Sequence, residues 1–208
     1  LLSITSGENN IAIGHLALDA LTDGDLNVAI GTSALSAYVG NGAVAIGREA
    51  LRNLNHADAI GTVGIGQGAG ASITSGQENI AIGYQAFDAN QTGNQNTVVG
   101  HQAMSDADGT ESNNTAIGYL ALTSLNEDGI NRNTAIGHSA LASSQTGASN
   151  TAIGSRAMAN ANVSGDNNTA VGESAGIALT TGDDNTVIGS SAGVAINTGF
   201  NNTLVGKA

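Results

Sequence analysis

The stretch NRNTAIGHSAL occupies residues 131–141, and close variants stand on either side of it, as NNTAIGYLAL at 113–122 and as SNTAIGSRAM at 149–158. Twelve copies of this phrase follow one another along the 208-residue chain, at intervals of 16 to 19 residues when they are aligned on the glycine that closes the phrase. The residue before that glycine is Ile or Val in every copy, and the third residue after it is Ala in all eleven complete copies. The chain is therefore a repeat protein, and the length of the period selects its architecture.

A period of about 17 residues is too short for the helical repeats, which need more than about thirty, and for leucine-rich repeats, which need at least about twenty. It fits one coil of a parallel β-roll or β-solenoid with two short strands and two turns. The absence of Pro agrees, because a stacked strand needs its backbone N–H groups. We expect an all-β rod of about twelve rungs, roughly 55 Å long at ~4.8 Å a rung. Residues 1–208 would form one repeat domain, a segment of a longer fibre, with an irregular rung near 56–70.

The composition excludes several classes of partner. With 17 acidic and 5 basic residues, the formal charge of −12 makes nucleic acid a poor partner. There is no run of about 18 apolar residues, so we expect no direct membrane insertion. The lack of Cys excludes disulfides and thiolate metal sites.

Strand parity sorts the residues before each closing glycine into two faces. The residues one and three before it share a face and are mostly β-branched, and we assign that face to the interior of the roll. The residue between them is never polar, although a strand with one face in water should be polar there. We therefore expect this intervening column to face other copies of the chain around a symmetry axis. Its members, with Gly64 at the same position, are Ala12, Ala29, Ala45, Ala81, Val98, Ala116, Ala135, Ala152, Ala170, Val187 and Leu204.

The other half of each rung carries a large apolar residue four after the glycine, as at Leu18 and Phe87, and another seven after it, as at Leu21 and Leu54. We expect both columns to fill the opposite wall. The Asn found four before the glycine in ten copies is expected to stack into a ladder at a turn.

The phrase NTAIGxxAL, with its intervening TG or SG turn, resembles the head repeats of trimeric autotransporter adhesins and the related fibre repeats of bacteriophage tail proteins. The resemblance covers essentially the whole chain. It implies a left-handed parallel β-roll, a homotrimer intertwined or packed about an axis, and an extracellular place on a bacterial outer surface or a virion tail fibre. The implied function is a structural and adhesive segment that attaches to a host or another surface through an unknown ligand, a glycan among the candidates. The adhesin heads use a shorter period, with Ser-Val in place of Asn-Thr. This difference favours a resemblance to phage-type fibres.

Parts of the sequence also fit three other functions, which are acyl transfer, ice binding and calcium binding. Ile-Gly-x-x-Ala-Leu also fits the hexapeptide repeat of β-helix acyltransferases, but His15, His101 and His138 share a variable column and His56 lies in the irregular rung, so we expect no enzyme. An ice-binding solenoid would use the Thr column that runs from Thr97 to Thr203, yet parity groups it with the Ile/Val column that we assign to the interior.

Calcium is the third. Acidic turns at Asp23–Asp25, Asp106–Asp108 and Asp183–Asp184 could supply oxygen ligands, but none matches a known calcium loop. We expect no cofactor and no dedicated metal site.

The column directly after the glycine is the most variable one and should face solvent. Within it four aromatic side chains stand over successive rungs, and they form a candidate surface-binding strip for a glycan or another surface: Tyr84, His101, Tyr119 and His138.

Overall fold

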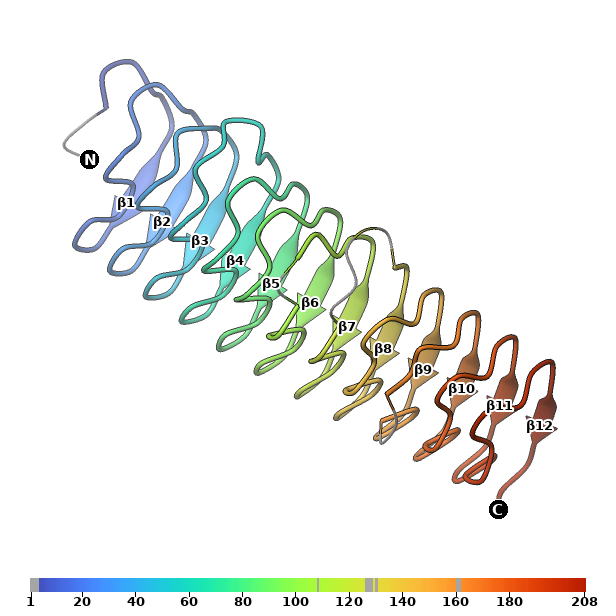
Figure 1. The fold of residues 1–208 in the computed structure, drawn as a ribbon. Coiled ribbons are helices and arrows are strands. Elements are labelled where there is room, and N and C mark those ends of the chain that lie inside the picture. The colour runs from blue at the N-terminus through green and yellow to red at the C-terminus, as the bar shows by residue number, and fades with distance from the viewer. Residues whose placement is uncertain (1–3, 108, 126–128, 130, 160–161) are drawn as a thin grey trace.

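Each copy of the phrase forms one three-residue strand, and the strands stack in chain order into a twelve-stranded parallel sheet (Figure 1). The computed structural model describes residues 4–107, 109–125, 129, 131–159 and 162–208. The chain coils once between successive strands, so the molecule is an elongated β-solenoid with β1 and β12 at opposite ends. The strands are β1 (Ile11–Ile13), β2 (Val28–Ile30), β3 (Val44–Ile46), β4 (Val63–Ile65), β5 (Ile80–Ile82), β6 (Thr97–Val99), β7 (Thr115–Ile117), β8 (Thr134–Ile136), β9 (Thr151–Ile153), β10 (Thr169–Val171), β11 (Thr186–Ile188) and β12 (Thr203–Val205).

The register of the sheet places like position over like position. Between β8 and β9, for example, Thr134 pairs with Thr151 and Ile136 with Ile153. The same holds in all eleven pairings, whatever the spacing along the chain. Each column of the sequence alignment is therefore a physical ladder along the rod, and the variation in repeat length is absorbed in the turns.

The closing glycine is required by close approach of the next coil. Gly137 has a φ of +135°, and a Cβ placed on it would lie 2.6 Å from the carbonyl oxygen of Gly154, its counterpart one rung on. A side chain there would be strained by its backbone angle and would also push the rungs apart.

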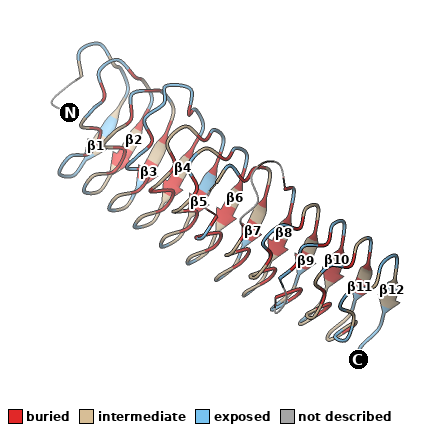
Figure 2. Cartoon of the chain, viewed as in Figure 1, coloured by how far each residue is buried: buried red, intermediate tan, exposed pale blue. Residues whose placement is uncertain are grey.

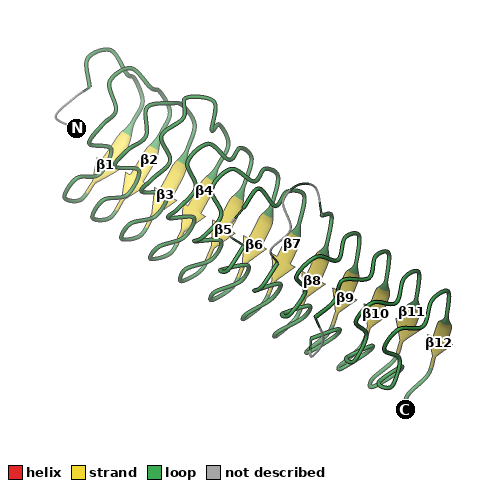
Figure 3. Cartoon of the chain, viewed as in Figure 1, coloured by secondary structure: helices red, strands yellow, loops and turns green. Residues whose placement is uncertain are grey.

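Only one wall of each coil is a strand in the described residues, where we expected two (Figure 3). The opposite wall is a stack of turns, in which residues two and four after the glycine take left-handed backbone angles, as Ser139 (φ 51°) and Leu141 (φ 52°) do. These turns still bond from coil to coil, since the Leu141 N–H donates to the carbonyl of Ala157 at 2.9 Å. The left-handed residues prevent the extended conformation that a second strand would need.

Buried residues stand in both walls of the coil (Figure 2), and together they form one hydrophobic core. The large residues of the turn wall behave as expected, and Leu18, Leu21, Phe87 and Leu141 have no exposed surface.

The strand wall contradicts our assignment of faces. The column of Ala29 and Ala135, which we expected to meet other chains, is 0% exposed within a single chain and belongs to the hydrophobic core. The same correction applies along the whole column. Buried inside the coil are Ala29, Ala45, Ala81, Val98, Ala116, Ala135, Ala152, Ala170 and Val187, while Ala12 and Leu204 occupy the same position in the two end strands and are partly exposed.

The interior is narrow, and this explains the correction. One wall supplies large residues, so most of the facing strands carry Ala, and the largest side chain buried in that column is Val, at Val98 and Val187. Gly64 shows the limit, because a Cβ on it would lie 2.6 Å from Cγ of Leu51. The residues of the column of Ala29 and Ala135 are therefore small because they face a crowded core. They cannot contact a second chain.

The Asn ladder forms as expected and joins consecutive coils. Asn133 is fully buried; its Nδ2 donates to the carbonyl of Gly147 at 2.7 Å, and its Oδ1 accepts from the N–H of Asn150 at 2.9 Å. The rung near 56–70 keeps this scheme at its strand. There Thr62 replaces Asn, and its hydroxyl donates to the carbonyl of Gly76 at 3.0 Å. The extra residues of that rung lie in the turn before β4.

Candidate functional site

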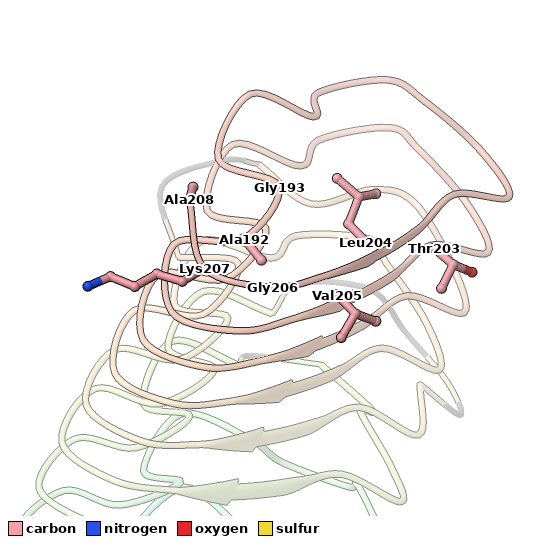
Figure 4. A pocket seen from close by; sticks show the side chains of 8 residues that line it. All are labelled: Ala192, Gly193, Thr203, Leu204, Val205, Gly206, Lys207 and Ala208. Atoms are coloured by element: carbon pink, nitrogen blue, oxygen red, sulfur yellow. The ribbon is translucent and has the colours of Figure 1, made fainter.

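Two surfaces of the rod repeat the same kind of side chain from rung to rung, and both are candidate binding surfaces. The first is the outward strand face, which we define as the residues one and three before each closing glycine. Figure 4 shows the alternation at β12, where Leu204 points over the interior of the coil while Thr203 and Val205 point away from it. The side chains shown in the figure line a pocket at the C-terminal end of the rod, where no further rung of the described chain covers Leu204.

The outward strand face has two parallel columns. One contains Ile11, Val28, Val44, Val63, Ile80, Thr97, Thr115, Thr134, Thr151, Thr169, Thr186 and Thr203. The other contains Ile13, Ile30, Ile46, Ile65, Ile82, Val99, Ile117, Ile136, Ile153, Val171, Ile188 and Val205. No charged residue occurs in either column, although the chain as a whole is acidic.

This face leaves apolar surface in water. Ile46, Ile117 and Ile153 are each 37% exposed, and Ile188 is 39% exposed. At ~4.8 Å a rung and ~3.3 Å a residue, the face measures about 50 Å by 10 Å, or on the order of 500 Å². This area is the outline of the face: the Ile/Val column runs its whole length, while the other column changes from Ile/Val to Thr at β6. Contiguous exposed apolar surface of this kind often marks an interaction site.

Parity and hydrophobicity assign these two columns to the interior of the coil, whereas the structure places them on its surface. One rung shows directly that the intervening column faces the turn wall. There the turn wall has Gly193 in place of a large residue, the facing strand has Val187 in place of Ala, and a Cβ on Gly193 would lie 2.9 Å from Val187 Cγ1.

The second surface is the aromatic ladder, which is the strip of Tyr84, His101, Tyr119 and His138 that the sequence indicated. The structure brings all four rings together. Their centroids are 5.0, 5.4 and 5.2 Å apart in succession, with interplanar angles of 23°, 28° and 15°. All four side chains are exposed. These separations lie within the range of offset-stacked aromatic pairs.

The ladder lies just beyond the corner made by the closing glycine, at the border of the outward strand face. The last member of its column, Lys207, extends away from the coil in Figure 4. A second column runs beside the ladder, and in it the Nε2 of Gln102 donates to Oε1 of Gln85 at 3.3 Å. In the four rungs of the ladder, neither of the two residues after the glycine carries a formal charge at pH 7.

The acidic turns use their carboxylates to hold neighbouring coils. Oδ1 of Asp23 accepts hydrogen bonds from the hydroxyls of Thr5 at 2.7 Å and Ser6 at 2.9 Å, and these bonds hold the pKa of Asp23 below its ordinary value. Oδ1 of Asp183 accepts from the N–H of Asp166 at 2.9 Å. Asp108, part of another acidic turn, lies outside the described residues. Among the residues that the structure describes, no three His, Asp or Glu side chains are grouped to hold a metal ion.

One carboxylate is perturbed in the opposite direction. Burial raises the pKa of Asp88 to about 6, and the nearby charge of Asp106 adds to the effect. Of the remaining histidines, His15 is exposed in the ladder's column, and His56 is exposed in a turn with its Nδ1 3.7 Å from Oδ2 of Asp58.

Comparison of the chain with protein-family models, with curated proteins and with solved structures finds no match. Within the described ranges no helix is both long and apolar enough to cross a membrane.

Proposed function

We propose that the chain is a structural and adhesive segment of a homotrimeric fibre, in which the rods associate through their outward strand faces. The uncharged, partly exposed Ile/Val ladder along the whole rod carries this proposal. Covering such a face lowers the free energy because apolar surface leaves water. No charge has to be desolvated when two copies meet. Burying apolar area contributes roughly 25 cal/mol per Å².

The regular ladder favours copies of the same chain as the covering partner. Like positions recur at every rung, so a second rod lying alongside presents the same spacing over the full length. Around a rotation axis the outward strand face of each rod can meet the faces of its neighbours, and closed symmetric assemblies of this kind are the usual form of homo-oligomers. The three-fold number, the left-handed coil and the place on a bacterial surface or virion tail follow from the resemblance of the NTAIGxxAL phrase to adhesin heads and phage fibres.

Sedimentation equilibrium of the chain tests the proposal. We expect a single species of three times the chain mass, with unfolding that depends on protein concentration. A stable, folded monomer at micromolar concentration would refute the association on which the fibre depends.

A second candidate function is ice binding, and one observation now favours it. Parity and hydrophobicity assign the Thr column to the interior, but the seven Thr residues of β6–β12 lie on the outward strand face. They form a regular row, in register from strand to strand, beside the Ile/Val column. This function needs the face to be open to solvent, so it requires the chain to be monomeric or its Thr columns to stay uncovered. Ice-recrystallisation assays on the chain, with Thr134→Lys and Thr151→Lys as variants on the face, test it directly.

A further inference from the structure

We propose that the aromatic ladder binds a linear, neutral polysaccharide that lies along the axis of the rod. This inference deepens the adhesive part of the proposed function and rests on it for its biological role. The ladder itself is built within a single chain, so binding does not require association of the chains.

The ring geometry determines what the ladder presents. His101 and Tyr119 each have a ring neighbour on both sides, so their faces are occupied by the stack. The ring edges remain for a ligand, and these carry the phenolic hydroxyls and the imidazole nitrogens. The result is a row of hydrogen-bonding groups whose positions are fixed by stacking before any ligand arrives, which lowers the ordering cost of binding.

The charge of the site selects a neutral ligand. The chain carries a formal charge of −12, whereas the four residues of the ladder and their neighbours Gln85, Gln102, Leu120 and Ser139 carry none at pH 7. Polyanions such as nucleic acid or sulfated glycans would be repelled by the protein as a whole. Amide, hydroxyl and imidazole groups in a row match the alternating donors and acceptors of sugar hydroxyls.

The spacing of the site favours a glycan over a peptide. The rings recur at 5.0 to 5.4 Å, close to the rise of one rung. An extended peptide repeats every ~3.3 Å per residue, or about 6.7 Å between side chains on one side, and loses register with the ladder within two rungs. One sugar unit of an extended chain is close in length to one rung, so a sugar can stand at every rung, and in a chain with two-fold symmetry alternate sugars can make the same contacts.

The experiment uses the four histidines as built-in reporters. The chain, with its imidazole carbons isotopically labelled, is titrated with cellohexaose, mannohexaose and xylohexaose, and with heparin as the anionic comparison. We expect the imidazole resonances of His101 and His138 to shift with a neutral hexaose, while those of His15 and His56 stay in place. Absence of any shift with all three neutral hexaoses, equal shifts at all four histidines, or a response to heparin alone would overturn the proposal.

Substitutions separate edge recognition from face stacking. The double variant Tyr84→Phe, Tyr119→Phe keeps the stack and removes the hydroxyls, and we expect it to bind at least tenfold more weakly than the unmodified chain. Thr32→Ala, in the same column but outside the ladder, is the matched control and should bind normally. Unchanged affinity of the double variant would refute recognition by the ring edges.

A variant that blocks association distinguishes the proposed trimer from the proposed glycan binding. Ile153→Glu on the outward strand face is expected to give a monomer that still binds the hexaose. If the unmodified chain is a monomer and binds, the trimer fails and the ladder stands; if it is a trimer and does not bind, the reverse holds.

Discussion

A single charge on the outward strand face should convert the assembly into monomers without unfolding the coil. Ile153 in β9 is 37% exposed in one chain. Burying an Ile side chain completely is worth about 1.5–3 kcal/mol, so covering the exposed third contributes roughly 0.5–1 kcal/mol per chain. Ile153→Glu removes that gain and puts a carboxylate in the contact. At several kcal/mol for each buried ion, three carboxylates cost on the order of 10 kcal/mol per trimer.

Sedimentation velocity at micromolar concentration measures the result, and circular dichroism confirms that the coil persists. We expect the unmodified chain to sediment as a trimer and Ile153→Glu as a folded monomer, because each 1.4 kcal/mol changes an association constant about tenfold. Ser155→Glu is the matched control: it introduces the same charge in the same rung, on the exposed column beyond the corner, and should leave the assembly intact. If Ile153→Glu sediments with the unmodified chain as the same oligomer, the outward strand face is not the contact.

Three further predictions concern the coil itself. Ala135→Glu buries a carboxylate in the core of each chain, so it should lower the thermal midpoint steeply even in monomers; an unchanged midpoint would show that Ala135 does not face the interior. Gly137→Ala should cost more stability than Gly42→Ala: both glycines have positive φ angles, of +135° and +69°, so both variants carry backbone strain of about 1–3 kcal/mol, but only the Cβ at Gly137 clashes with the next coil, while that at Gly42 meets nothing closer than 4.0 Å. Chemical denaturation compares the two, and equal losses would contradict the close approach of the rungs. Because the pKa of Asp88 is raised in the folded state to about 6, the folded protein binds more protons than the unfolded chain between about pH 4 and 6, so the Asp88 contribution makes stability fall as pH rises through that window. Asp88→Asn should remove that part of the pH dependence and raise the midpoint at pH 7, as thermal scans at several pH values would show.

The period and the columns of the solenoid could be predicted from the sequence, because in-register stacking turns every alignment column into a ladder. The invariant closing glycine, the buried Leu and Phe of the turn wall and the Asn ladder follow from residue type and spacing alone. The aromatic ladder was also identifiable, since Tyr84 and His101 stand at the same position of successive copies.

The direction of the faces could not be predicted from parity, which shows that Thr134 and Ile136 share a face but not which face is inside. Hydrophobicity misled the assignment, because Ile is more apolar than Ala and was given the interior. Volume decides instead. The turn wall already supplies Leu141 and its equivalents, so the facing position is filled in most rungs by a residue as small as Ala135, and Val98 and Val187 are the largest residues buried there. The prediction of a second strand was wrong because Ser139 and Leu141 take left-handed backbone angles. These residue types do not indicate such angles in a sequence.

The hydrogen bonds between coils run along the rod, and this orientation sets how the protein responds to mechanical load. Tension along the axis pulls directly on the bonds that join one rung to the next, as between Asn133 and Asn150. A rung that detaches under tension lengthens the chain from ~4.8 Å of rise to nearly 60 Å of extended backbone, at about 3.5 Å for each of its roughly 17 residues. The remaining rungs keep their contacts, because each coil touches only its neighbours. A fibre built on this fold would therefore yield in steps of one rung under load, dissipating force while the rest of the rod and its surface ladders stay folded.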